Sequence, residues 1–172
     1  LAFAVALVVG SDYRMDRIDA FRKAFIDPLQ AGYHVRQTVL TLGSGGLAGR
    51  GLGNGILKFG WLPFGYTDSI YAVIGEELGF IGCVTVLALF GILAWRGYRI
   101  AARAQDSFGA FLAAGLTTLI VVQALVNIGV ATAAVPFTGV TLPFISYGGS
   151  SMVVSLLAVG ILFNISGHRV EA

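Results

Sequence analysis

The sequence predicts an all-α, polytopic membrane protein, in which a transmembrane helix bundle carries a long external loop and a broken, re-entrant-like external segment. Of its 172 residues, 56% are hydrophobic and 12% are charged, whereas soluble domains carry about 25% charged residues. The run 78–95 is uncharged and apolar, and the stretch 107–167 contains no Asp, Glu, Lys or Arg. Apolar stretches of about 18 or more residues predict helices that cross a bilayer.

The chain opens with the apolar segment LAFAVALVVG, which has no initiator Met, no basic n-region and no small-residue cleavage site. A signal peptide would carry these features, so residues 1–10 are interpreted as the end of a truncated transmembrane helix. The sequence is therefore expected to be a fragment, with further helices before residue 1. Complete spans are predicted at 72–95, 108–135 and 150–167.

Basic residues near the helix ends set the expected topology, because short loops rich in Lys and Arg stay in the cytoplasm. The segment 96–107 contains three of the eleven basic residues and is predicted as a cytoplasmic loop. The tail 168–172 lies two spans farther along and is predicted on the same side. The segment 11–71 lies one span earlier, so we expect a long external (periplasmic or extracellular) loop there.

The first part of this external loop has the pattern of an amphipathic helix. Ile18, Phe21 and Phe25 recur at helical spacing, charged residues occupy the other faces, and Pro28 ends the pattern. Such a helix either lies on the membrane surface or is an ordinary connector, and the sequence leaves both readings open.

A glycine-rich turn follows, with seven glycines between residues 43 and 55. Glycine permits positive φ and close backbone approach, so this stretch is predicted to be a tightly folded loop. It matches neither the dinucleotide pattern G-x-G-x-x-G nor the P-loop, since no GK[ST] follows. Nucleotide binding is not expected here, and no nucleic-acid partner is expected for the chain.

Three carboxylates lie at the end of this loop and in the helix after it. Asp68 stands where the helix begins, so its carboxylate could cap the helix or take part in chemistry. Glu76 and Glu77 lie farther into the apolar span, where carboxylates usually face a cavity or a partner. At about 100° per residue, Glu76 lies roughly 80° from Asp68 around the helix and Glu77 nearly opposite. We therefore expect the two glutamates to be structural or site-lining residues.

The external segment 136–149 is uncharged, but Pro136, Pro143 and a pair of glycines interrupt it. Broken backbone at membrane depth is tolerated only where it is buried in protein or lines a cavity, so we expect a re-entrant-like loop. Its hydroxyl groups either contact a substrate or satisfy backbone groups that the prolines leave free. The candidates are Ser146 and Tyr147 in this segment and Ser150 and Ser151 directly after it.

Six motifs occur in one order along the chain: YRMDRI, GSGGLAGRGLGNG, LPFGYTD, AVIGEELGFIG, ALVNIGV and LPFISYGGSS. This order resembles the C-terminal half of the SEDS family (shape, elongation, division and sporulation) and is most similar to its FtsW division branch. The resemblance implies a ten-helix peptidoglycan glycosyltransferase that polymerises lipid II at the outer face of the bacterial plasma membrane. It also implies that the aspartate of the TD pair, Asp68, is the catalytic carboxylate.

One block departs from the family pattern. The commoner family sequence is LPEAHTD, whereas Phe64, Gly65 and Tyr66 replace Glu, Ala and His in this chain. No histidine therefore stands next to the TD pair to share a proton with Asp68.

Polymerising a lipid-linked sugar needs a base near the attacking hydroxyl and positive charge near the leaving diphosphate. Asp68 is expected to be the general base. Lys58, Arg50 and Arg36 are the nearest cations in sequence, and Lys58 is favoured because it follows the glycine-rich turn. No second loop carboxylate is placed to act as a nucleophile, so a single attack that inverts the anomeric carbon to a β-linked glycan is predicted.

The sequence predicts no metal site and no certain cofactor. Cys83 is the only cysteine and lies in an apolar run, which excludes an internal disulfide and a cysteine-based zinc site. A divalent cation such as Mg²⁺ could stabilise the leaving diphosphate.

Two other kinds of function fit the same features. Intramembrane glutamates and broken helices occur in transporters, so a flippase for the lipid-linked precursor is one alternative, and a non-catalytic division scaffold is another. The family resemblance implies lipid II, the nascent glycan strand, a class B penicillin-binding transpeptidase and other division proteins as partners within the lipid bilayer.

Overall fold

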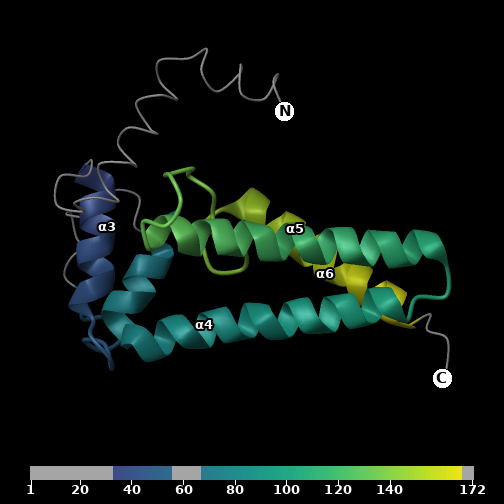
Figure 1. The fold of residues 1–172 in the computed structure, drawn as a ribbon, viewed down its shortest axis with the longest axis horizontal. Coiled ribbons are helices and arrows are strands. Elements are labelled where there is room, and N and C mark those ends of the chain that lie inside the picture. Colours follow the sequence, from purple (N-terminus) through teal and green to yellow (C-terminus); the bar gives the residue numbers. More distant parts are fainter. Residues whose placement is uncertain (1–32, 56–66, 168–172) are drawn as a thin grey trace, which may run out of the picture.

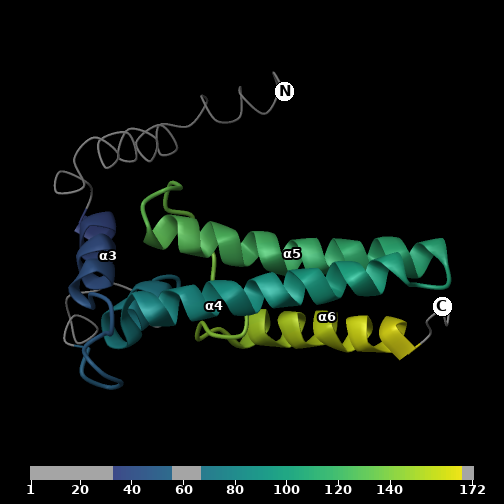
Figure 2. The same ribbon diagram turned by 60° about the horizontal axis from the view of Figure 1, so that its bottom comes forward.

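The computed structural model describes residues 33–55 and 67–167, which fold into helices joined by loops (Figure 1). The helices are α3 (Tyr33–Ser44), α4 (Ile70–Ala102), α5 (Ser107–Ala131) and α6 (Gly149–Gly167). The long helices α4, α5 and α6 lie side by side, and α3 stands across one end of them (Figures 1 and 2). These three are long and apolar enough to cross a membrane. The predicted all-α membrane bundle is therefore confirmed.

Helix α4 extends beyond its predicted span of 72–95 and continues through the arginines to Ala102. The first half of the predicted cytoplasmic loop 96–107 is thus helical, because long arginine side chains can leave the apolar region while their backbone stays in the helix. The guanidinium groups of Arg96 and Arg99 lie 5.2 and 5.4 Å from the centre of the Trp95 ring. The connection to α5 is correspondingly short.

Helix α5 ends at Ala131, four residues before the predicted end of the 108–135 span. The residue before a proline is disfavoured in the helical conformation, and Pro136 follows the turn that ends α5. That turn is closed by the amides of Ala134 and Val135, which donate to the Gly129 carbonyl at 2.8 and 3.1 Å.

Helix α3 lies inside the segment 11–71 that the sequence predicts as a loop. Thr38 and Thr41 are buried on it, and the Thr41 hydroxyl donates to a carbonyl within the helix at 2.7 Å. The predicted amphipathic helix before Pro28, the predicted helix end 1–10 and the tail 168–172 lie outside the described residues.

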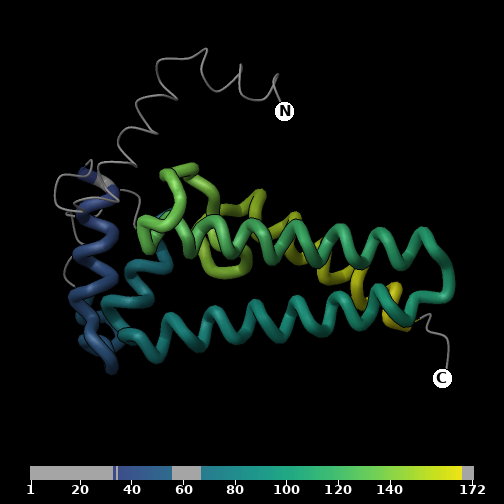
Figure 3. Tube along the Cα trace, viewed as in Figure 1, coloured from purple at the N-terminus to yellow at the C-terminus, as the bar shows by residue number. Residues whose placement is uncertain are grey.

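Helix α4 is broken at Gly79, which produces the elbow near one end of the helix in Figure 3. Gly79 has φ 67° and ψ −163°, a backbone region that is essentially restricted to glycine. The break leaves the carbonyls of Glu76 and Glu77 and the amides of Phe80 and Ile81 without helical partners. Buried groups of this kind need partners from elsewhere in the protein.

The glycine-rich loop supplies partners for the carbonyls of the first half of α4. The amides of Arg50 and Gly51 donate to the carbonyls of Glu76 and Glu77, each at 3.0 Å. Gly49 approaches this helix so closely that an added Cβ would lie 2.5 Å from the carbonyl carbon of Glu77. Glycine is therefore required at this contact.

The same loop also accepts hydrogen bonds from the second half of α4. The amide of Phe80 donates to the Gly46 carbonyl at 2.9 Å, and the amide of Ile81 donates to the Leu47 carbonyl at 3.3 Å. The tightly folded loop predicted from the glycines thus closes the break in α4 by bonding to both of its halves.

Candidate active site

Asp68 lies in the turn directly before α4. The start of α4 is at the end of the bundle where α3 stands (Figure 1). The residue is buried, with 8% of its surface exposed. The Thr67 hydroxyl donates to Asp68 Oδ1 at 2.8 Å, and a Cβ added at Gly139 would lie 3.8 Å from Oδ2. Ser69 occupies the N-cap position of α4. The alternative that Asp68 caps this helix is therefore wrong.

Asn127 fixes the backbone of this turn from α5. Its side-chain amide donates to the carbonyl oxygen of Asp68 at 2.9 Å and to the carbonyl oxygen of Val140 at 2.7 Å. Asn127 is 1% exposed, and its Oδ1 has no hydrogen-bond partner in the described part of the chain. One buried amide thus joins α5, the turn before α4 and the broken segment.

The broken segment connects α5 to α6 and packs against the same turn. Buried Ser146 donates its hydroxyl hydrogen to the Thr67 carbonyl and accepts from the Leu142 amide at 2.7 Å. Phe144 has a positive φ of 65°, a strained backbone for a bulky residue. The Ser146 hydroxyl therefore satisfies backbone groups of the broken segment, which is the structural role that the sequence left open for it.

The other predicted hydroxyl residues are more accessible. Tyr147 is 83% exposed and lines a cavity of about 480 Å³ together with Ser146 and Ile70, the first residue of α4. Ser150 and Ser151 line a second cavity of about 240 Å³ between α5 and α6. Both cavities adjoin the broken segment, and the first one adjoins the turn that holds Asp68.

Glu76 and Arg50 form an ion pair where the glycine-rich loop meets α4. Glu76 is fully buried, and its Oε1 lies 3.7 Å from Arg50 Nη1, whose side chain is 42% exposed. The Arg50 Nε also donates to the Ser44 carbonyl at 3.3 Å. Glu76 therefore joins the helix to the loop, as a structural residue would.

A family model described as a cell cycle protein of the FtsW, RodA and SpoVE type matches residues 1–171. The chain belongs to this family. It is the SEDS family that the sequence motifs resemble. The three helices that are long and apolar enough to cross a membrane, together with this family, place the chain in a multi-pass protein of the bacterial inner membrane.

Two relatives show how much of this family's length the chain represents. Stage V sporulation protein E of Bacillus subtilis is 48% identical over 164 residues, which cover 95% of this chain and 45% of that protein. A probable peptidoglycan glycosyltransferase FtsW of Geobacter metallireducens is 50% identical over 166 residues, which cover 96% of this chain and 44% of that protein. The chain thus spans less than half the length of these curated relatives.

Two solved structures of the family share the fold. A chain in a peptidoglycan synthase complex, studied for the coordination of polymerization and crosslinking, matches with a TM-score of 0.69 at 30% identity and covers 99% of this chain and 48% of that one. An aspartate-to-alanine mutant of Thermus thermophilus rod shape determining protein RodA matches with a TM-score of 0.57 at 34% identity, over 62% of this chain and 36% of that one.

Not every residue predicted for the site is placed by the structure. Lys58 lies outside the described residues, Arg36 is exposed on α3, and Glu77 is half-buried at the break in α4. No group of three or more His, Cys, Asp or Glu side chains gathers among residues 33–55 and 67–167. A role for Mg²⁺ stays an expectation from the chemistry of the diphosphate.

Sequence reasoning missed Asn127 and Gly79. Asn127 belongs to the family motif ALVNIGV, and an amide in an uncharged span usually bonds across helices, which is a signal for such a contact. Gly79 belongs to the motif AVIGEELGFIG, where the glycine alone does not distinguish a break from a packing contact.

Proposed function

We propose that the protein to which this chain belongs is a peptidoglycan glycosyltransferase that polymerises lipid II at the outer face of the plasma membrane. The observation that carries the proposal is the position of Asp68, a buried carboxylate at the mouth of a transmembrane helix, against the broken segment. Relatives named as probable peptidoglycan glycosyltransferases support the assignment.

Asp68 is the general base of the proposed reaction. It removes the proton from the acceptor sugar hydroxyl while the oxygen forms a bond to the anomeric carbon of the donor. The bond between that carbon and the diphosphate oxygen breaks, and the lipid diphosphate leaves with the electron pair. One displacement inverts the anomeric carbon, so the α-linked donor becomes a β-linked glycan.

The hydrogen bonds around Asp68 suit this role, because a base acts well only when it is held in a fixed place. Asn127 and Ser146 hold the backbone on either side of the carboxylate, at the carbonyls of Asp68 and Thr67. The cavity lined by Tyr147 provides space next to the turn for part of a sugar or of the lipid chain.

Positive charge near the leaving diphosphate completes the proposal. Lys58, Arg50 and Arg36 remain the candidates. The ion pair with Glu76 holds the guanidinium of Arg50 beside α4. The exposed part of the guanidinium is free to meet solvent or a ligand. A divalent cation bound with the substrate would add to this charge.

The biological role that we propose is polymerisation during cell division, in complex with a class B penicillin-binding transpeptidase. The support comes from the FtsW relatives and from the solved peptidoglycan synthase complex with which this chain shares its fold. Complementation of a division-deficient strain tests the division role, and co-purification with the transpeptidase tests the partnership.

Activity in detergent micelles separates the enzyme from a transporter, because a micelle has no second leaflet to which a lipid could be moved. The full-length protein is incubated there with labelled lipid II, and the products are separated by length. Long glycan strands with β linkages are expected. Full-length protein that binds lipid II but leaves it unpolymerised would favour the transporter. If the protein were only a scaffold, the Asp68→Asn variant would support cell division as well as the wild-type protein does.

A further inference from the structure

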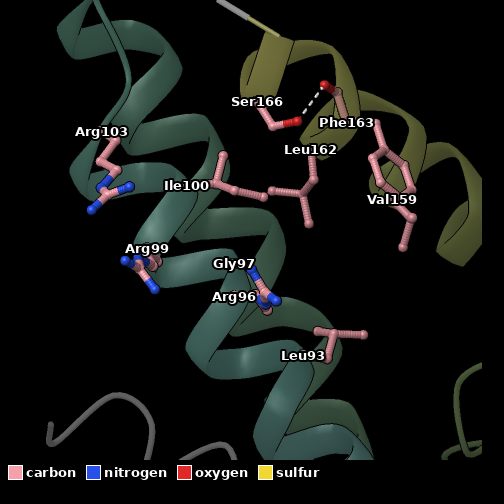
Figure 4. Close-up of a pocket in the computed structure, with 10 residues that line it drawn as sticks. All are labelled: Leu93, Arg96, Gly97, Arg99, Ile100, Arg103, Val159, Leu162, Phe163 and Ser166. Atoms are coloured by element: carbon pink, nitrogen blue, oxygen red, sulfur yellow. Dashed lines mark hydrogen bonds between the residues drawn. The ribbon is translucent and has the colours of Figure 1, made fainter. Parts of the chain in front are cut away.

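A third cavity lies at the opposite end of the bundle, far from Asp68. It is a half-open cavity of about 540 Å³ between α4 and α6, within the range of about 300–1,000 Å³ that is usual for small-molecule sites. Its walls are apolar: Leu93 and Ile100 come from α4, and Val159 and Phe163 come from α6. Figure 4 shows the side chains of Ile100 and Leu162 pointing toward one another across it.

Three arginines line the same cavity. Arg96, Arg99 and Arg103 all come from α4, and they follow one another along the helix in Figure 4. None of them lies within ion-pair distance of a carboxylate among residues 33–55 and 67–167. The carboxylate nearest in sequence, Asp106, caps α5 by accepting from the Gly109 amide at 2.9 Å. Within the described residues, the cavity therefore combines an apolar wall with positive charge that no carboxylate neutralises.

Aromatic residues indicate the depth of this site in the membrane. Trp95 and Tyr98 are 56% and 45% exposed on the last turns of α4, and both residue types concentrate where membrane helices reach the headgroup region. Arg96 and Arg99 lie against the Trp95 ring. The arginines are thus at headgroup level, while Leu93 and Val159 extend the cavity toward the hydrocarbon region.

We propose that this cavity binds an anionic phospholipid of the cytoplasmic leaflet. The phosphate group lies among Arg96, Arg99 and Arg103, and an acyl chain lies along the apolar wall that α4 and α6 form. Basic pockets between transmembrane helices on the cytoplasmic side suit such lipids. The site is distinct from the proposed active site in position, because it lies at the other end of the bundle.

Lipid selectivity measures this site directly. The full-length protein is placed in nanodiscs that hold equal mole fractions of phosphatidylglycerol and phosphatidylcholine, and the lipids retained after gentle release are counted by native mass spectrometry. The wild-type protein is expected to retain phosphatidylglycerol at least about tenfold over phosphatidylcholine, because each basic residue near the surface favours anionic lipids.

Two pairs of variants distinguish lipid binding in this cavity from attraction of lipids by general surface charge. Replacing all three arginines by Gln removes the preference, whereas replacing them by Lys keeps most of it. Val159→Trp fills the cavity and also removes the preference, whereas Leu157→Trp, on an exposed position of the same helix outside this cavity, leaves it unchanged.

Equal retention of the two lipids by the wild-type protein would overturn the proposal, and it is the result expected if another part of the full-length protein covers the cavity. An unchanged preference in the Gln variant, with its helix content intact by circular dichroism, would overturn it as well. The comparison of the two lipids on the wild-type protein does not depend on whether any variant folds.

Discussion

The side-chain amide of Asn127 donates to the carbonyl oxygen of Asp68 at 2.9 Å, between residues that are 59 positions apart in the sequence. The same amide donates to Val140 at 2.7 Å. Neither carbonyl belongs to a helix that could supply this bond, because Asp68 precedes α4 and Val140 lies in the broken segment between α5 and α6. The position of the proposed base therefore depends on a residue of another helix.

Replacing Asn127 by Leu should slow polymerisation by about 100-fold with little change in the KM for lipid II, since displacing a catalytic group by about 1 Å has an effect of that size. It also leaves two buried carbonyls without a partner, at about 1–3 kcal/mol each. Initial rates over a range of lipid II concentrations give kcat and KM separately.

Asn164→Leu is the matched control, because Asn164 is exposed on α6. The control should polymerise at the wild-type rate. A wild-type kcat for Asn127→Leu would show that this amide does not position Asp68.

Gly79→Ala should destabilise the protein. The φ of 67° and ψ of −163° at this position cost a residue with a side chain about 1–3 kcal/mol, and the added Cβ would lie 2.6 Å from the Leu47 carbonyl oxygen. Thermal unfolding in detergent, followed by tryptophan fluorescence, should show a lower Tm.

Gly91→Ala in the same helix provides the comparison. No atom lies within 4 Å of a Cβ added at Gly91, and alanine favours a helix over glycine by about 0.5–1 kcal/mol. Its Tm should be equal or higher. If the two variants unfolded at the same temperature, the break in α4 would not be a constraint on the fold.

The Arg50 and Glu76 pair should respond unequally to the loss of each partner. Arg50→Gln leaves a fully buried carboxylate without its guanidinium, whereas Glu76→Gln leaves an arginine that is 42% exposed and can be solvated. Arg50→Gln should therefore destabilise more, though by less than the about 3–5 kcal/mol seen when fully buried pairs are broken.

Unfolding of the two single variants and of the double variant in denaturant measures this difference. The double variant should recover part of the stability lost in Arg50→Gln. Equal losses in the two single variants would mean that burial of the Glu76 carboxylate does not govern the pair.

The sequence predicted those features that depend on local pattern. Uncharged apolar runs predicted the three long helices, and Pro136 with Pro143 predicted the break between α5 and α6. The end of α4 was misplaced, because arginines such as Arg99 signal a loop by charge although their side chains can reach the headgroup region from within a helix. Helix α3 was missed, although Val35, Val39 and Leu42 recur along it at helical spacing.

Features that depend on contacts between distant segments could not be predicted. The seven glycines near residue 50 indicated a tight loop, but its partner is the break at Gly79, which looks like any helical glycine in the sequence. The polar loop in an apolar chain indicated where to look for chemistry, and the TD pair of the family motif then singled out Asp68. Its connection to Asn127 could not, because nothing local relates two residues that far apart.

The rate of lipid II polymerisation by the full-length protein with Asp68→Asn tests the central claim most directly. General bases contribute about 10²–10⁴-fold to a rate, so kcat should fall by at least about 100-fold. The matched variant Asp106→Asn should keep the wild-type rate, because asparagine also caps helices well and Asp106 caps α5 at the opposite end. An Asp68→Asn protein that is folded and polymerises at the wild-type rate would contradict the claim.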